Sequence, residues 1–294
     1  MKIIKLLLKG LGLIVLIAVS AFSFFVYQVS QDRISESIPE IDTQREARLL
    51  TAFFGRDSDL PLSALILYRK ALNKDGMPLV FSQEVDPSTL EVTDFEVTTQ
   101  NGEKFMAEHA TLMPANEEFE LRTVLLIGEY GDHPENPPVS VEVVGDLKTR
   151  SGQQLKGQSI GVIPLPDGPV ISYAEHFTID EDYPYVKRGR GCDCPKEETQ
   201  LVVRVVWSGG VKALDGRELG NPELDRFEVE LLQGEDTIRV QPYKLADLGD
   251  NDNNIDLCLK ERGLPLSVRV KANTAIDPND DKNPMTEAPV LSRW

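Results

Sequence analysis

The sequence predicts an all-β protein, in which two tandem β-sandwiches follow an N-terminal signal or anchor helix and one short helix. Three observations predict this architecture. Short runs of alternating apolar and polar residues recur through most of the 294 residues, with turns rich in Gly, Pro, Asn and Asp between them. A Pro-rich segment at 163–169 separates two rounds of such strands, because repeated Pro interrupts a hydrogen-bonded ladder. Lysines followed by a long apolar run open the chain.

Residues 1–31 are predicted to be a signal peptide or a signal anchor. Three lysines precede an uncharged run from Gly10 to Gln31, which is about as long as a membrane-spanning helix of roughly 20 residues. Small residues ending at Ala21 offer a cleavage site, whereas aromatic residues that continue to Tyr27 favour an uncleaved anchor. Because the lysines lie before the run, we expect a cytoplasmic N-terminus and export of everything after residue 31. The expected location is the inner membrane facing the periplasm or exterior, or the secreted fraction after cleavage.

A spacer at 32–61 is expected to contain a short helix at about 44–54. Thr43 and Glu46 have the spacing of a capping box, in which each side chain satisfies a backbone donor of the other residue. Apolar residues follow at helical spacing, and Gly55 is a plausible helix stop. We expect this helix to pack on the domain that follows it, and the alternative is a position near the membrane surface.

The first predicted sandwich covers residues 62–165. Its strands are expected at the apolar runs 65–68, 79–81 and 123–127. Phe95 and Val97 alternate with polar residues before the hairpin residues Asn101-Gly102. Valines at 139, 141 and 143 alternate with Ser and Glu, which predicts one buried and one exposed face.

The second predicted sandwich covers residues 170–294. Its strongest strand is the run LVVRVVW at 201–207, and further strands are expected at 227–230, 255–259 and 266–270. A turn is expected at 233–236. Trp207 and Phe227 fall at strand positions, so we expect both rings in the core.

The two rounds of strands resemble each other, which indicates an internal repeat of one supersecondary plan. The first copy contains FSQEVDPSTLEVTDFEV at 81–97, and the second copy at 205–234 ends in DRFEVELLQG. The first of these stretches resembles the opening motif of bacterial Ig-like domains of the surface-layer-protein type. That resemblance covers residues 62–160 well and 200–290 weakly, since Trp207 and a Gly pair replace the Phe and Pro of the motif in the degenerate second copy. It implies two Ig-like β-sandwich modules outside the cytoplasm, acting without catalytic residues as spacers or adhesive parts of surface proteins.

The charge of the chain restricts its partners. With 48 acidic and 31 basic residues the net charge is −17, which argues against nucleic acid because phosphate binding needs clustered Lys and Arg. We expect a protein or glycan of the cell envelope as the partner, with membrane attachment through the N-terminal segment.

Two acidic loops are candidate calcium sites, because each places oxygen ligands at every second position. The first set has the spacing of an EF-hand loop but carries Ile255 where such a loop needs Gly. The alternative is that Asp and Asn are present for turn geometry alone. Calcium is the cofactor that the sequence suggests. The candidate ligands are Asp250, Asp252, Asn254 and Asp256 in the first loop and Asp277, Asn279, Asp281 and Asn283 in the second.

The three cysteines allow one disulfide in an oxidising compartment. Cys192 or Cys194 is expected to bridge Cys258, and a bridge between Cys192 and Cys194 is the alternative. In every case the third thiol is left over or pairs between chains. A zinc knuckle is excluded because it needs a second Cys pair.

No catalytic residue is predicted. The histidines 109, 133 and 176 lie in different segments, and the chain lacks a G-x-S-x-G nucleophile elbow. The leading interpretation is an exported, non-catalytic binding or structural module of the bacterial cell envelope. The alternatives are a calcium-dependent glycan-binding module that uses the two acidic loops, and an envelope hydrolase on a β scaffold with carboxylates as acid and base.

Overall fold

The computed structural model describes residues 45–117, 119–179, 191–249 and 252–292. All of these described residues belong to one compact unit. The described part is mostly β, with four short 3-10 helices: η1 (Leu62–Ile66), η2 (Pro87–Thr89), η3 (Val92–Asp94) and η4 (Asn221–Arg226). None of the helices in the described part is long and apolar enough to cross a membrane. The predicted signal or anchor at 1–31 lies outside the described residues.

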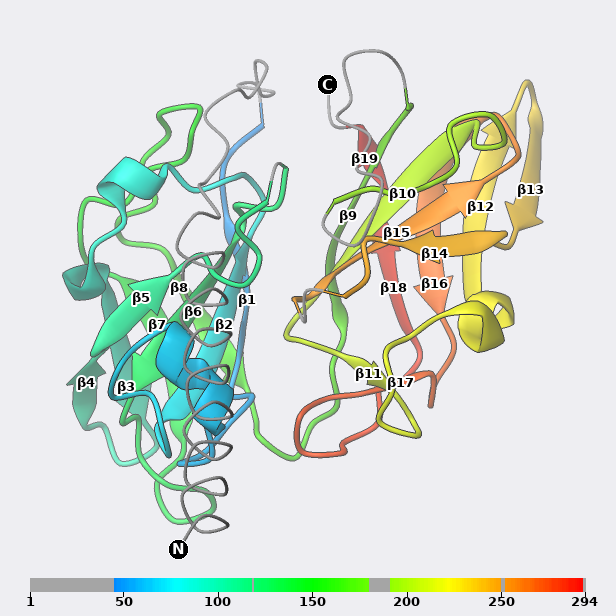
Figure 1. Ribbon diagram of the computed structural model, residues 1–294. Helices are drawn as coiled ribbons and strands as arrows, with labels where there is room; N and C mark the ends of the chain where they lie inside the picture. Colours follow the sequence, from blue (N-terminus) through cyan, green and yellow to red (C-terminus); the bar gives the residue numbers. More distant parts are fainter. Residues whose placement is uncertain (1–44, 118, 180–190, 250–251, 293–294) are drawn as a thin grey trace, which may run out of the picture. The chain divides into compact units, whose positions relative to one another are not determined.

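The first eight strands form one continuous sheet, here called the N-terminal module (Figure 1). Their order across the sheet is β4-β3-β7-β8-β1-β2-β6-β5, and all neighbours pair antiparallel except β1 and β8, which run parallel. The strands are β1 (Leu49–Phe53), β2 (Asp75–Phe81), β3 (Phe95–Thr99), β4 (Lys104–Met106), β5 (His109–Thr111), β6 (Thr123–Gly128), β7 (Pro138–Val143) and β8 (Ser159–Ile163). An all-β fold is therefore correct, whereas the Ig-like topology of this module stays a prediction.

The short helix expected at about 44–54 is wrong, because residues 49–53 form strand β1. This segment pairs with β2 on one side and with β8 on the other. The backbone just before it is held by glutamine side chains, since Ala47 N–H donates to Gln153 and Leu49 N–H donates to Gln158. Pairing on two edges outweighs the local helical spacing of the apolar residues. The first sheet thus begins before residue 62.

Two further details of the N-terminal module differ from expectation. The run at 65–68 is not a strand: η1 ends at Ile66, and Ala64 and Leu67 pack on a small core with Leu60. Val139 is exposed although Val141 and Val143 are buried. The cause is a register shift between Thr98 and Thr99 of β3, which interrupts the alternation at that end of β7.

The later strands form the C-terminal module, in which a five-stranded and a four-stranded sheet pack on one core (Figure 1). The sheet orders are β14-β15-β10-β9-β19 and β13-β12-β16-β18, with a separate pair β11-β17. Trp207 and Val205 enter this core from one sheet, and Phe227 and Val229 enter it from the other. The strands are β9 (Ile171–Phe177), β10 (Leu201–Trp207), β11 (Lys212–Ala213), β12 (Phe227–Gln233), β13 (Asp236–Val240), β14 (Lys244–Ala246), β15 (Asn254–Leu259), β16 (Leu264–Val270), β17 (Ala275–Ile276), β18 (Thr286–Pro289) and β19 (Leu291–Ser292).

The internal repeat is visible as a local arrangement that occurs in both modules. A 3-10 turn leads directly into β3 in the first copy and into β12 in the second. Each of these strands forms a hairpin with the next strand and pairs on its other edge with a Val-rich strand. The opening phenylalanines lie opposite valines, Phe95 opposite Val143 and Phe227 opposite Val270.

All seven residues of β10 are buried, because both of its faces are covered. Val203, Val205 and Trp207 face the core of the C-terminal module. The alternate residues contact other groups: Val202 packs beside Phe119, and Val206 packs against Val80 of β2 and Tyr173 of β9. We call the contact surface between the two modules the junction. Arg204 lies between Val202 and Val206 and is the one charged residue of the strand.

Candidate functional site

Arg204 is fully buried and forms a bidentate ion pair with Asp256. Its Nε donates to Asp256 Oδ1 at 2.7 Å, and its Nη2 donates to Asp256 Oδ2 at 2.9 Å. The pair follows from the sheet register, because Arg204 of β10 lies directly opposite Asp256 of β15. A planar guanidinium suits this bidentate geometry better than a lysine would.

Two more carboxylates reach the same guanidinium from other segments. Asp247, immediately after β14, accepts from Arg204 Nη2 at 3.1 Å. Glu120, in the segment between β5 and β6 of the N-terminal module, lies 3.1 Å from Arg204 Nη1. The side chains of Arg204, Asp247 and Glu120 are all fully buried. The arginine therefore joins carboxylates of both modules at the junction.

Unusual backbone conformations place two of these carboxylates. Phe119 has a φ of +71° and Asp247 a φ of +62°, a region that non-glycine residues seldom occupy. The buried Phe119 packs with Phe177, Val202 and Ala246 of the C-terminal module, and its carbonyl accepts from Arg204 at 3.4 Å. Packing of the Phe119 ring on the C-terminal module thus positions the next residue, Glu120, beside Arg204. Strained residues of this kind concentrate where surrounding structure fixes a site.

The electrostatics of the site are dominated by burial of negative charge. Burial raises the pKa of Glu120 well above its usual value, and the carboxylates Asp247 and Asp252 raise it further. Arg204 opposes this rise without cancelling it. Burial likewise raises the pKa of Asp256, although Arg204 and a hydrogen bond with the Cys192 thiol lower it. One guanidinium does not balance the carboxylates around it.

Glu117, Glu120 and Asp247 form what we call the carboxylate cluster. One oxygen of each lies within 4.8 Å of an oxygen of the other two. Glu120 and Asp247 each direct one oxygen to Arg204, while Glu120 Oε2 and Asp247 Oδ1 are buried and accept no hydrogen bond from a donor group. Buried polar atoms nearly always have partners, so these two oxygens indicate a place for a positively charged ligand.

A second buried ion pair reinforces the junction. Arg122 of the N-terminal module donates to Glu175 of β9 at 2.9 Å, and both side chains are buried. The Arg122 guanidinium also lies 4.1 Å from the centre of the Tyr173 ring. Thr51 and Ser172 share a hydrogen bond between the modules at 2.7 Å. Polar contacts thus surround the apolar patch formed by Val80, Tyr173 and Val206.

The first predicted calcium loop is brought only partly to this site. Asp250 lies outside the described residues. Asp252 accepts from the Asn254 backbone at 2.7 Å and from its side chain at 2.9 Å, and it lies near enough to Glu120 to raise the pKa of that residue. Asp256 is a partner of Arg204 in the middle of β15. Asn254 Oδ1 is buried without a hydrogen-bond partner. Calcium binding by these residues stays a prediction.

The second predicted calcium loop uses its oxygens to hold its own turn. Asp277 Oδ1 accepts from the backbone of Asn279 and Asp281 at 2.8 Å each. Asn283 Oδ1 accepts from the backbone of Thr274 and Ala275. Within the described residues of 277–283, no three acidic side chains come within ligand distance of one another. The turn interpretation of this loop has direct hydrogen bonds in its favour, and its calcium binding is untested.

The structure contains a disulfide between Cys194 and Cys258, and Cys192 is a buried free thiol. The bridge ties the segment before β10 to strand β15, across 64 residues of sequence. Of the pairings that the sequence left open, Cys194 is the partner of Cys258. Burial raises the pKa of the Cys192 thiol, so that it stays protonated beside Asp256.

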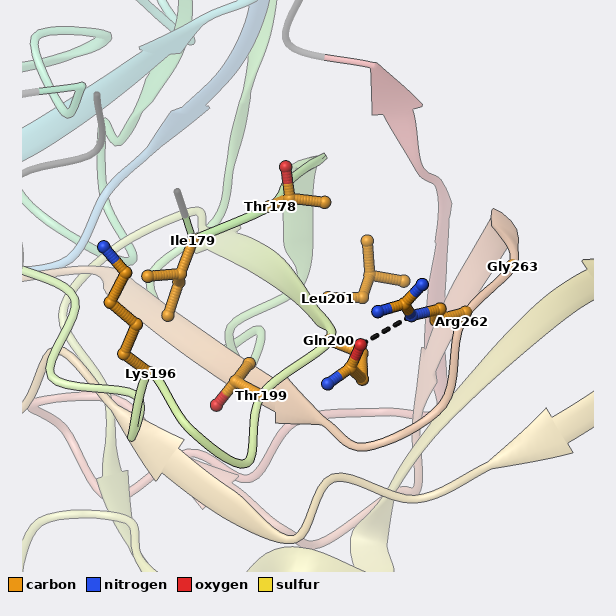
Figure 2. Close-up of a pocket in the computed structure, with 8 residues that line it drawn as sticks. All are labelled: Thr178, Ile179, Lys196, Thr199, Gln200, Leu201, Arg262 and Gly263. Carbon is orange, nitrogen blue, oxygen red and sulfur yellow. Dashed lines mark hydrogen bonds between the residues drawn. The ribbon is translucent and has the colours of Figure 1, made fainter. Parts of the chain in front are cut away.

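A polar hollow of about 480 Å³ lies at the start of β10 (Figure 2). The side chains of Lys196, Gln200 and Arg262 line it, and Arg262 donates to Gln200 at 2.5 Å. The remaining lining residues are Thr178, Ile179, Thr199, Leu201 and Gly263. Its cations are exposed surface groups, and the hollow contains none of the residues that the sequence singled out.

Comparison with known proteins identifies no family for this chain. No protein-family model matches it, and no curated protein matches it. A similar solved structure is the crystal structure of the N-terminal part of the bacterial S-layer protein SbsC. The two chains are 12% identical, the match covers 83% of this chain and 44% of that one, and the TM-score is 0.27. This chain therefore spans less than half the length of that one, and a score this low establishes neither a shared fold nor a shared function.

The sequence pattern did not predict the residues that the structure brings together: Glu117, Glu120, Arg204 and Asp247. One signal was available. An arginine in the middle of the apolar run LVVRVVW is almost never buried without a carboxylate partner, so Arg204 alone predicts buried acids nearby. Which acids they are depends on segments far apart in the sequence.

Proposed function

We propose that this chain is an exported, non-catalytic structural or binding module of the bacterial cell envelope. The observation that carries the proposal is the junction, in which the buried pair of Arg122 and Glu175 and the apolar contact of Val80 with Val206 join two β modules. Such a junction suits a stiff spacer, because modules on a free linker would move independently. An Ig-like topology for both modules, and a protein or glycan of the envelope as partner, are parts of the proposal.

Two features support export. The lysines and the apolar run within residues 1–31 have the pattern of a signal or anchor. The disulfide between Cys194 and Cys258 favours an oxidising compartment, since cytosolic thiols are kept reduced. An uncleaved segment would attach the protein to the inner membrane with both modules outside.

The test is the location of the full chain, carrying a C-terminal epitope tag, in a bacterium that has a periplasm. We expect protease to remove the tag from spheroplasts but not from intact cells. Membrane association with an intact N-terminus would identify an anchor, and a soluble form beginning near Phe22 would identify a cleaved signal. A variant with Lys2, Lys5 and Lys9 changed to Glu should be retained inside.

The matched control reverses three exposed lysines of the modules: Lys70, Lys212 and Lys282. Its export should equal that of the unmodified chain, because these residues lie far from the leader in the sequence. A tag that is digested only after cell lysis in all three proteins would contradict the proposal.

A further inference from the structure

We propose that Glu117, Glu120 and Asp247 bind a calcium-class divalent cation between the two modules. This site differs from both acidic loops that the sequence suggests, because two of its ligands come from the N-terminal module. It goes beyond the proposed function, since an envelope spacer does not require a metal.

The spacing of the carboxylate cluster fits one shared ion. Calcium takes oxygen ligands at about 2.3–2.6 Å, so two ligands on one ion lie at most about 5 Å apart. The three oxygens of the cluster lie within 4.8 Å of one another. A position between them lies at most about 2.8 Å from each oxygen, so small shifts of the side chains bring all three to calcium–oxygen distance.

Two buried oxygens point to the ligand independently of the clustering. Glu120 is 0% exposed and Asp247 is 1% exposed. Arg204 occupies one oxygen of each, at 3.1 Å in both cases. Glu120 Oε2 and Asp247 Oδ1 accept no hydrogen bond from a donor group, and the two carboxylates lie close enough to share a proton. Arg204 thus orients both carboxylates while leaving one oxygen of each for a second cation.

The local charge favours a divalent ion over a shared proton. Around Arg204 lie the three carboxylates of the cluster together with Asp252 and Asp256. The neighbouring Arg122 is matched by Glu175 and Glu84. A proton neutralises one negative charge and bridges two oxygens, whereas a divalent ion neutralises two and accommodates at least three.

The donor set selects the class of metal. All three donors are carboxylate oxygens, which suit calcium, magnesium and manganese rather than zinc or copper. Magnesium demands a compact octahedron and is seldom held by an all-protein cage, so calcium fits best. Glu117 is only partly buried, whereas the other two residues of the cluster are buried.

The experiment uses the full chain, stripped with EDTA and checked for residual metal by mass spectrometry. Titration with calcium chloride, followed by calorimetry, should give about one ion per chain. The melting temperature should rise by about 5 °C when free calcium exceeds Kd 100-fold. The same concentration of magnesium should produce a smaller rise.

Two variants locate the site. Glu120→Gln removes the charge of a buried ligand with little change of side-chain shape. Glu117→Gln removes the charge of a partly buried ligand, where a substitution disturbs folding less. Each should weaken calcium binding at least tenfold. The matched control is Asp281→Asn, which removes a partly buried carboxylate from the second acidic loop and should leave Kd unchanged.

Three outcomes would overturn the proposal. One is a stripped wild-type chain that neither binds calcium nor gains melting temperature. Another is unchanged affinity in Glu117→Gln, with loss of affinity in Asp281→Asn, which would assign the ion to the 277–283 loop. The third is a Glu120→Gln chain that melts higher than the wild type in EDTA while calcium has no effect on either, which would assign a shared proton.

Discussion

At the scale of single residues, Arg204 is a buried charge whose desolvation must be offset by its ion pairs at the junction. Transfer of a guanidinium from water to a protein interior is expensive, and its ion pairs offset that cost only when geometry and hydrogen bonds are good. Arg204 meets the condition through hydrogen bonds to Asp256 and Asp247, and Glu120 lies 3.1 Å away as a third carboxylate. Removal of the arginine would leave these carboxylates buried without their cation.

We therefore expect Arg204→Met to lower the free energy of unfolding by about 3–5 kcal/mol. The matched control is Arg269→Met, which removes another strand arginine whose pair with Glu287 is 35% exposed on the arginine side. That change should cost much less than Arg204→Met, because exposed ion pairs contribute little. Urea unfolding in EDTA measures both values. Equal losses of unfolding free energy in the two variants would show that the buried ion pairs of Arg204 contribute no more to stability than an exposed pair does.

Asp75 of β2 makes the stability of the fold depend on pH. Its carboxylate is 1% exposed and accepts from the backbone of Ser58 and Tyr130 at 2.7 and 2.6 Å. Burial raises its pKa to about 6, and the nearby Asp57 and Glu129 act in the same direction. Between its unfolded pKa near 3.9 and about 6, the folded chain holds this proton more tightly than the unfolded chain.

Stability from Asp75 therefore falls as the pH rises through 6. Between pH 5 and pH 7 we expect a loss of about 1 kcal/mol from this group. The measurement is urea unfolding at both pH values for the wild type and for Asp75→Asn, whose amide does not titrate. The wild type should lose about 1 kcal/mol more than the variant over that interval. A difference of zero, or one of opposite sign, would show that Asp75 ionises normally in the folded chain.

At the scale of elements, most strands were predictable because alternation of apolar and polar residues needs only local sequence. β3, β10, β12, β15 and β16 fall where the pattern places them. β1 was not predictable from its own residues, since its partners β2 and β8 decide its conformation. Contacts between distant segments also bring Glu120 and Asp247 together at Arg204. Their contact depends on the docking of Phe119, which no local period encodes.

Close packing also crosses the junction at the ends of elements. Gly209 follows β10, and a Cβ at this position would lie 2.8 Å from the ring of Phe53, the last residue of β1. The side chain of Asn279 donates to the carbonyl of Gly55 at 2.9 Å, just after the same strand. The strand β1 that the sequence did not reveal is thus one of the main elements of the junction.

At the scale of the whole molecule, the modules should unfold together. The junction includes fully buried apolar side chains and two buried ion-pair groups, so separation of the modules exposes both to water. Two-state behaviour predicts that the calorimetric and van't Hoff enthalpies of unfolding agree. For the wild-type chain we expect one transition with a ratio of these enthalpies near one.

Leu50→Asp should divide that transition into two. Leu50 of β1 is partly buried and packs on Val80, Tyr173 and Val206 at the junction. The matched control is Leu125→Asp on β6, because Leu125 is also partly buried but packs on Leu60, Ala64 and Ala71 within the N-terminal module. A charge at Leu125 should lower the melting temperature of a single transition, whereas a charge at Leu50 should uncouple the modules. Differential scanning calorimetry distinguishes the two results. If Leu50→Asp gave one shifted transition like the control, coupling would have to run through the buried ion pairs and not through the apolar patch.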